Sequence, residues 1–515
     1  MQARGGASSE LPVRTDSFDS YNPKQKDIKL TLCDKLIIAF GSATAVFLLV
    51  LFVHPAMVEQ RGAYKAETPF GANMSAVDIH KHTKRARAAV VGYATPEATE
   101  VYAFRHKKSN SHFSYVHGLY LSSIGIGSYL GESDEETATK LEEAVHDTVL
   151  GGINVIDTSI NYLGQRAEKA IGRALRRLFM KEHALTREAL FISTKAGFIP
   201  SDSEKGASPS QVVQEWKRRW SEEHGDRPFP SHEIVGDKHC ISPECIDASL
   251  LTSIHNLGVP SIDLLYLHNV EKQLGDLHLS RDQVLERIGR AFMRLEYYRS
   301  KGVIRFYGLA TWNSFRVPEK ADAFLDLGEL IDLAKKAAAG SGIDKEEHGF
   351  RFVQAPLSMS LRELAASEYH MERRTFLESA SANNITVVSS RSIDAGSTAK
   401  VAKSQGVYNR CVKESNDHPS YPLSEVGHTL NAVRSAVTTA LVGMKEEAHV
   451  KDNLRVLHAN KLSGEERACI FTTASKHELG QGQGQGQGQG HGHGHGHGQG
   501  GKGHAHRISR GGSSN

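Results

Sequence analysis

Cysteine is scarce in this sequence, and no pair of cysteines has the CxxC spacing. The 515 residues include only Cys33, Cys240, Cys245, Cys411 and Cys469. This odd, small number predicts neither a disulfide framework nor a zinc site, and unpaired cysteines suit a reducing compartment. An excess of charge of one sign is also lacking, because the formal net charge is +3. A chain of this size that is nearly neutral gives no indication of a nucleic-acid partner.

A glycine-rich nucleotide-binding turn is absent as well. No GxGxxG follows any expected strand, and literal matches such as Gly496-x-Gly498-x-x-Gly501 lie in a repetitive tail. A doubly wound open sheet usually keeps such a turn behind its first strand. The absence therefore counts against that fold.

Composition divides the chain into five segments. Residues 1–35 are polar, 36–53 apolar, and 54–93 form a polar tether with a basic run. Residues 94–475 are long enough to bury one large core, so we expect a single elaborated α/β domain there. Residues 476–515 are rich in Gly, Gln and His, and we expect this tail, like residues 1–35, to be disordered. The histidines of the tail are typical of weak metal binding or of a solvated segment without a role, and we expect no metal in the chemistry.

The segment from Leu36 to Val53 predicts one membrane span. Its 18 residues carry no charge and just reach the length that crosses a bilayer core. A buried core helix would show a polar face, and a cleaved signal peptide would not follow so long a polar stretch. Lys24, Lys26, Lys29 and Lys35 precede the span and favour a cytosolic N-terminus, whereas the cysteines favour a cytosolic domain. The side of the membrane on which the domain lies is left open.

Eight short apolar strands, mostly separated by amphipathic helices, predict a (β/α)₈ TIM barrel, an α/β fold. We expect strands at 123–128, 154–158, 190–195, 262–268, 304–310, 350–354, 385–390 and 438–443. Helices are expected at 135–150, 165–180, 243–257, 282–301, 325–339, 371–382 and 423–435. A doubly wound open sheet is the alternative. Two long connections, 199–242 and 394–421, leave the carboxyl ends of strands, where barrel loops shape substrate pockets.

Four polar residues come at or just beyond the ends of three successive strands. Asp157 lies at the end of the second strand and Tyr162 follows it, Lys195 ends the third, and His268 ends the fourth. Each alone is more often a solvated or structural residue. Together, on one barrel, they predict an active site, because barrel enzymes place their chemistry at the carboxyl ends of the strands.

The motifs that carry these residues resemble the aldo-keto reductase superfamily, in a less-characterised branch. The matching segments are GINVIDTSINY, FISTK, IDLLYLH, IRFYGLA, FVQAPL, ITVVSS and TTALVGMKEEAHVKDNL, within residues 94–459. The resemblance implies that Tyr162 donates a proton, that Lys195 stabilises its phenolate, and that Asp157 holds Lys195. It also implies that His268 orients the substrate carbonyl. The implied reaction interconverts an aldehyde or ketone with an alcohol, with hydride from a nicotinamide.

The resemblance also implies a set of cofactor residues. Gln354 matches the glutamine that binds the nicotinamide carboxamide, Thr311 stands where an asparagine is usual, and Ser390 replaces the tyrosine that stacks on the ring. Asp452 and Asn453 match the pair that contacts adenine. The cations that bind a 2′-phosphate align with Gly443 and His449, with Lys445 close by. NADP(H) is therefore favoured and NAD(H) is possible.

Two functions from different classes follow. The first is a membrane-tethered carbonyl reductase that acts on a small-molecule carbonyl or alcohol. The second is a non-catalytic, nucleotide-sensing barrel that serves as a regulatory subunit on a membrane. The complete set of four polar residues favours the first, and Ser390 leaves room for the second.

Overall fold

A computed structural model describes residues 92–274, 279–412 and 420–473. All of them belong to one unit of the chain, Thr68–Asn515. The predicted polar N-terminus, the predicted span Leu36–Val53, nearly all of the tether and the tail from residue 476 lie outside the described residues. None of the helices within the described ranges is long and apolar enough to cross a membrane.

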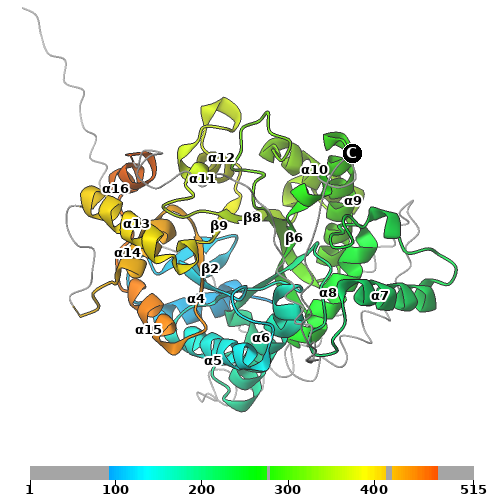
Figure 1. Cartoon of the computed structure of the whole chain (residues 1–515), viewed down its shortest axis with the longest axis horizontal. Helices are drawn as coiled ribbons and strands as arrows, with labels where there is room; N and C mark the ends of the chain where they lie inside the picture. The colour runs from blue at the N-terminus through cyan, green and yellow to red at the C-terminus, as the bar shows by residue number, and fades with distance from the viewer. Residues whose placement is uncertain (1–91, 275–278, 413–419, 474–515) are drawn as a thin grey trace, which may run out of the picture. The chain divides into compact units, whose positions relative to one another are not determined.

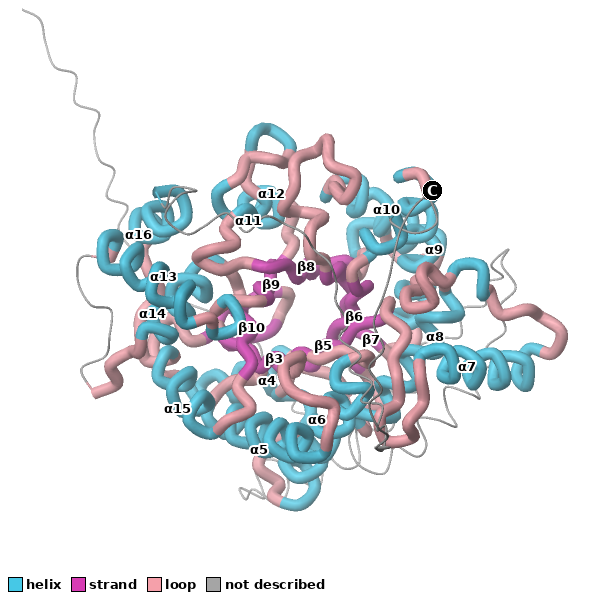
Figure 2. The backbone as a smooth tube through the Cα atoms, viewed as in Figure 1, coloured by secondary structure: helices cyan, strands magenta, loops and turns pink. Residues whose placement is uncertain are grey.

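Eight parallel strands close into a barrel, seen as the magenta ring in Figure 2. Each strand pairs with the next along the chain, and β10 closes the ring by pairing with β3, with Ala440 opposite Ile124. The predicted (β/α)₈ barrel is therefore confirmed, and an open doubly wound sheet is excluded. The strands are β3 (Ile124–Gly127), β4 (Val155–Asp157), β5 (Phe191–Ala196), β6 (Ile262–His268), β7 (Ile304–Ala310), β8 (Phe350–Pro356), β9 (Thr386–Ser390) and β10 (Thr439–Gly443).

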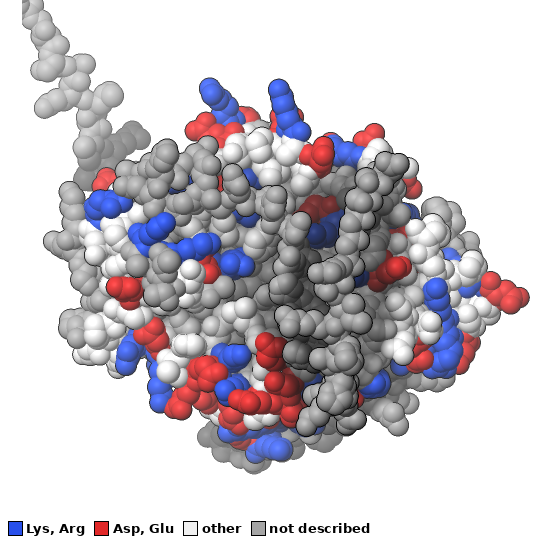
Figure 3. All heavy atoms as spheres, viewed as in Figure 1, with Lys and Arg blue, Asp and Glu red and all other residues white. Residues whose placement is uncertain are grey.

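Helices surround the strands, as Figure 1 shows. They are α4 (Pro96–His106), α5 (Glu135–Gly151), α6 (Arg166–Arg176), α7 (Pro209–His224), α8 (Pro243–Leu257), α9 (Arg281–Ser300), α10 (Leu327–Gly340), α11 (Glu363–Ala366), α12 (Phe376–Ala382), α13 (Thr398–Cys411), α14 (Glu425–Ala436), α15 (Glu447–Val456) and α16 (Gly464–Ala468). On the face in Figure 3, acidic and basic side chains of the described residues are interspersed. Ion pairs such as Arg166–Glu135 and Arg173–Glu142 join α5 to α6.

One predicted helix begins later than expected. The segment 371–382 is helical only from Phe376, because Glu372 and Arg373 adopt left-handed backbone angles of φ 61° and 57°. Thr375 then starts α12 with a capping box, in which its hydroxyl accepts from the Glu378 N–H and the Glu378 carboxylate accepts from the Thr375 N–H.

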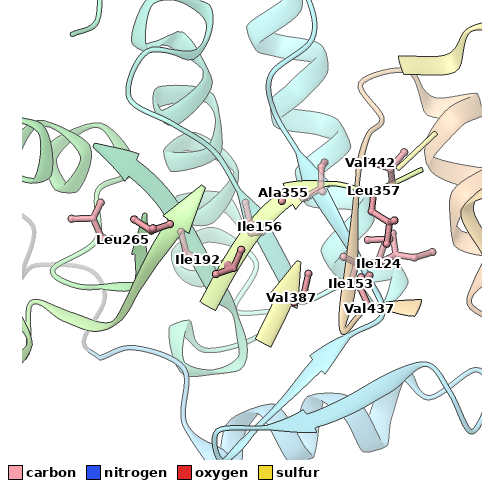
Figure 4. Close-up of a cluster of buried hydrophobic side chains, with 14 of the residues drawn as sticks. Ile124, Ile153, Ile156, Ile192, Leu265, Ala355, Leu357, Val387, Val437 and Val442 are labelled. Atoms are coloured by element: carbon pink, nitrogen blue, oxygen red, sulfur yellow. The ribbon is translucent and has the colours of Figure 1, made fainter. Parts of the chain in front are cut away.

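The strands are apolar on both faces because the barrel buries both. Val155, Phe191, Leu264 and Phe352 belong to the cluster inside the barrel, which also takes in Leu119 and Leu121 of the hairpin β1 (Phe113–Val116) and β2 (Leu119–Ser122). Their neighbours in sequence, such as Ile156, Ile192 and Leu265, face the helices (Figure 4). Side chains alternate along a strand, so the inward set continues to residues 157, 195, 268 and 354.

Two disulfides contradict the prediction drawn from the cysteines. Cys240 is bonded to Cys245 at the start of α8, and Cys411 at the end of α13 is bonded to Cys469. The second pair is 58 residues apart in sequence, so only the folded chain brings its members together. The fifth cysteine, Cys33, lies outside the described residues. With four cysteines paired, cysteine content no longer favours a reducing compartment.

Candidate active site

Asp157 and Lys195 form a buried ion pair at the carboxyl ends of β4 and β5. The Lys195 ammonium Nζ lies 2.6 Å from Asp157 Oδ2 and 2.7 Å from the carbonyl oxygen of Thr158. The side chain of Lys195 is 0% exposed and that of Asp157 is 5% exposed. A buried ion is costly unless it is paired and hydrogen-bonded, and here each charge supplies the other's partner.

Asp157 also accepts hydrogen bonds from two further side chains, one on β5 and one on β8. The Ser193 hydroxyl of β5 and the Gln354 amide of β8 both donate to Oδ1, at 2.7 and 2.9 Å. The carboxylate therefore ties three strands together around Lys195. Its position is set by the alternation of the barrel strands, which turns residues 157, 193, 195 and 354 to the inside.

A tight turn brings Tyr162 over Lys195. Tyr162 begins a 3₁₀ turn in which Leu163, Gly164 and Gln165 all have positive φ, and α6 follows directly. A Cβ on Gly164 would lie 1.8 Å from Ser203 Oγ, so this turn needs a glycine. The Lys195 ammonium lies 4.9 Å from the centroid of the Tyr162 ring. The Tyr129 ring packs edge-on against Tyr162 at a centroid distance of 5.1 Å.

The electrostatics suit a tyrosine that donates a proton. Burial raises the pKa of Tyr162, and the charge of Lys195 opposes this shift without cancelling it. Burial acts to lower the pKa of Lys195, but the charge of Asp157 and the interaction with Tyr162 outweigh it, so the net shift is upward. At neutral pH a protonated phenol thus lies beside a charged ammonium, which is ready to stabilise a phenolate.

His268 ends β6 and faces the same space. Its ring centroid lies 6.0 Å from that of Tyr162, and its Nδ1 lies 3.3 Å from the Ser159 hydroxyl. Burial lowers the pKa of His268 well below its usual value, and the charge of Lys195 adds to this effect. The imidazole is therefore neutral near pH 7, so it offers hydrogen bonding to this space rather than a charge.

The predicted nicotinamide residues lie at the ends of three adjoining strands. Thr311 follows β7, and its backbone N–H donates to the Gln354 carbonyl of β8 at 2.9 Å. The buried hydroxyl of Thr311 has no hydrogen-bond partner within the described residues. A buried polar group without a partner next to Gln354 fits a ligand that carries a carboxamide. Ser390 is half-buried at the end of β9, where its hydroxymethyl group offers no aromatic ring.

The predicted adenosine residues lie in α15 and in the loop before it. Asn453 is buried, and Asp452 is half-buried with its carboxylate accepting a 2.6 Å hydrogen bond from Ser424 at the start of α14. Lys445 is half-buried in the loop before α15, whereas His449 is exposed. The predicted adenosine residues thus belong to α15 and the loop before it, whereas the ion pair lies on β4 and β5.

A family model and several relatives match the chain. The model described as "Aldo/keto reductase family" matches residues 123–470, which is more than half of the chain. The protein belongs to the aldo/keto reductase family. D-threo-aldose 1-dehydrogenase of a Pseudomonas species is 28% identical over 38% of this chain and 51% of the relative. NADH-specific methylglyoxal reductase of Escherichia coli K12 is 25% identical over 41% of this chain and 54% of the relative.

The chain thus spans about half the length of the curated relatives that it matches. Among solved structures, an aldo/keto reductase from Klebsiella pneumoniae in complex with NADP and acetate covers 70% of this chain and 94% of its own. Its sequence identity is 15% and the TM-score is 0.45, a likeness too low to bear on chemistry.

The candidate active site of this protein also contains residues that the sequence motifs did not indicate. Ser193 was within reach of prediction, because it lies two residues before Lys195 on the same face of β5. Phe198 and Trp312 border the strand ends: the Phe198 ring is 4.9 Å from that of His268, and the Trp312 ring lies 5.4 Å from the Arg391 guanidinium. Neither aromatic residue follows from strand periodicity, because both lie in loops.

Proposed function

We propose that this protein is an NAD(P)H-dependent oxidoreductase that interconverts an aldehyde or ketone with an alcohol. The observation that carries the proposal is the Lys195 ammonium, held by Asp157 and lying under the ring of Tyr162. A phenol next to a buried cation is a proton donor whose conjugate base is already stabilised. A nicotinamide supplies the hydride when it is bound.

The four polar residues then have distinct roles. Tyr162 donates its phenolic proton to the substrate oxygen during reduction and takes it back during oxidation. Lys195 stabilises the phenolate in between, and Asp157 keeps Lys195 charged in a buried place. His268, neutral at the working pH, forms a hydrogen bond with the substrate oxygen and so fixes its distance from Tyr162.

The cofactor is proposed to extend across the ends of β7 to β10. Gln354 and the free hydroxyl of Thr311 would hold the carboxamide, with Ser390 beside the ring. Asp452 and Asn453 would contact adenine, and Lys445 with His449 would bind a 2′-phosphate. Lys445 is the better placed of these two residues because it is half-buried in the loop before α15, whereas His449 is exposed, so NADP(H) is favoured and NAD(H) remains possible.

The substrate is proposed to be a small carbonyl compound. The relatives' names, an aldose dehydrogenase and a methylglyoxal reductase, support an aldehyde of a few carbons or its hydroxylated analogue. The second candidate, a nucleotide-sensing barrel without turnover, is favoured by one observation. Ser390 provides no ring to stack on the nicotinamide, which weakens the hold on that group.

A single-turnover experiment separates these two functions. The full chain is mixed with one equivalent of NADPH or NADH, and a panel of aldoses, 2-oxoaldehydes and aromatic aldehydes is added. Loss of the reduced-nicotinamide absorbance with formation of the alcohol supports the reductase. Nucleotide binding with no oxidation across the whole panel would contradict it and favour the sensor.

We also propose that the chain is attached to a membrane through Leu36–Val53, a segment that lies outside the described residues. The support is its 18 uncharged residues. Retention of the full chain in the membrane pellet at alkaline pH is expected, whereas a variant that lacks residues 36–53 should be released. Release of both would contradict the attachment, and digestion by protease in sealed vesicles would report on which side the barrel lies.

A further inference from the structure

A second buried histidine, His239, contacts the backbone of His268. His239 lies in the long connection between β5 and α8 and is 2% exposed. Its Nε2 lies 2.6 Å from the carbonyl oxygen of His268. The connection that carries it also forms isolated bridges from His239 to Phe198 and Val235, so the segment is tied to the end of β5.

The partners of His239 determine which of its ring nitrogens carries the proton. Arg287 of α9 donates to Gln273 Oε1 at 2.5 Å, and arginine is only a donor. The amide nitrogen of Gln273 therefore faces His239 and donates to Nδ1 at 2.8 Å. Nδ1 is thus the acceptor, so the hydrogen is on Nε2 and is donated to the His268 carbonyl.

The relay from Arg287 through Gln273 to His239 needs a neutral imidazole. Burial lowers the pKa of His239 to about 4, and the nearby charge of Lys272 acts in the same direction. The required form is therefore the only one present near pH 7. Gln273 is itself buried, and its side-chain amide contacts both Arg287 and His239 directly, so no water is needed between these side chains.

The backbone just after β5 packs closely against His268 and His239. A Cβ on Gly197 would lie 2.7 Å from the His268 carbonyl oxygen and 3.0 Å from His239 Nε2. The Phe198 ring is edge-on to both imidazoles, at centroid distances of 5.0 Å from His239 and 4.9 Å from His268. Directly after His268, Asn269 adopts a left-handed conformation with φ 51°. The last residue of β6 is thus held between a close backbone neighbour and a sharp turn.

We propose that His239 is a positioning residue for His268, because its hydrogen bond to the His268 carbonyl fixes the end of β6 and with it the imidazole that faces the substrate. This inference rests on the proposed function, since it takes His268 to orient the substrate oxygen. His239 itself touches neither substrate nor cofactor. Its loss should therefore affect the hydride-transfer step and leave nucleotide binding unchanged.

The test compares His239→Leu with His239→Gln in the full chain. Leucine removes the donor, whereas the side-chain amide of glutamine keeps an N–H that reaches the same carbonyl. We expect His239→Leu to lower kcat about 10- to 100-fold, since displacement of a reacting group by 1 Å costs about 100-fold. The primary deuterium isotope effect on kcat with deuterated NADPH should rise. The Kd of NADPH, measured by fluorescence, should stay within about twofold, and His239→Gln should recover most of the rate.

Three controls give each outcome one meaning. Rates are expressed per nucleotide-binding site, so misfolded protein does not count. His268→Ala in the same assay tests the proposed function: wild-type turnover there would refute the role of His268 itself. If His268→Ala is impaired while His239→Leu is within twofold of wild type, the positioning role alone is refuted. Equal losses in the Leu and Gln variants would refute it too. If His239→Leu does not fold, His239→Met, which also lacks an N–H donor but has a more flexible side chain, should reproduce the lower kcat; an unchanged kcat would overturn the proposal.

Discussion

Replacing Asp157 with asparagine should leave Lys195 as a buried cation without a counter-charge. The Lys195 ammonium is fully buried and depends on Asp157 for its only ion pair within the described residues. Removing one member of a buried pair typically destabilises a protein by about 3–5 kcal/mol. We expect Asp157→Asn and Lys195→Met each to cost roughly 3 kcal/mol or more, because the side chain that remains keeps some hydrogen bonds but loses its opposite charge.

The double variant isolates the interaction. In Asp157→Asn/Lys195→Met neither charge remains, so the loss should be well below the sum of the single losses, with a coupling energy of about 2–3 kcal/mol. Urea unfolding followed by circular dichroism measures all four free energies. Glu215 and Arg218 on α7 provide the matched control, because their side chains are 40% and 56% exposed and lie 2.7 Å apart. Their coupling should stay below about 1 kcal/mol. Equal coupling for the two pairs would refute the argument that burial makes Asp157–Lys195 special.

Two further predictions concern pH and the cofactor. Four histidines have pKa values lowered to about 3 or 4, mainly by burial, so the unfolded chain takes up protons below pH 6.5 that the folded chain does not; they are His112, His117, His239 and His348. Each should cost about 1.4 kcal/mol of stability at pH 5.5, and protonation of Asp247, whose pKa is raised to about 6, offsets a small part of this loss. The free energy of unfolding measured in urea should therefore fall by roughly 4–5 kcal/mol between pH 7.5 and 5.5, and an increase would contradict the assignment. Lys445→Ala should raise the Kd of NADPH roughly fivefold, the equivalent of about 1 kcal/mol, and leave that of NADH unchanged in equilibrium titrations. Equal effects on both nucleotides would exclude Lys445 from the 2′-phosphate site.

The barrel was predictable because each strand has a local signal in the sequence. Each expected strand differs from the observed one by at most two residues, since a short apolar run flanked by polar residues is visible in sequence. The grouping of Asp157, Lys195 and His268 followed from the same signal. In a closed parallel barrel the carboxyl ends of all strands meet at one rim, and every second residue along each strand faces inward.

The parts that escaped prediction depend on contacts between distant segments. The Cys411–Cys469 disulfide joins residues 58 apart, and nothing in the spacing of the cysteines indicates it. The helix α13 lies in the long connection 394–421, for which no helix was expected, and no expected helix covers α4. His239 lies in a connection of 44 residues, 199–242, without strand periodicity, and it meets His268 only because both segments pack against Gly197. Loops carry function, but their sequence does not specify which strand end they reach.

The central claim is that Tyr162 transfers the proton, and Tyr162→Phe tests it most directly. Phenylalanine keeps the ring that lies 4.9 Å from Lys195 and removes only the hydroxyl. We expect turnover to fall by about 10²–10⁴-fold, which is the usual contribution of a positioned proton donor. The Kd of the nicotinamide nucleotide should stay within about twofold. Turnover within twofold of wild type, with nucleotide binding intact, would contradict the account.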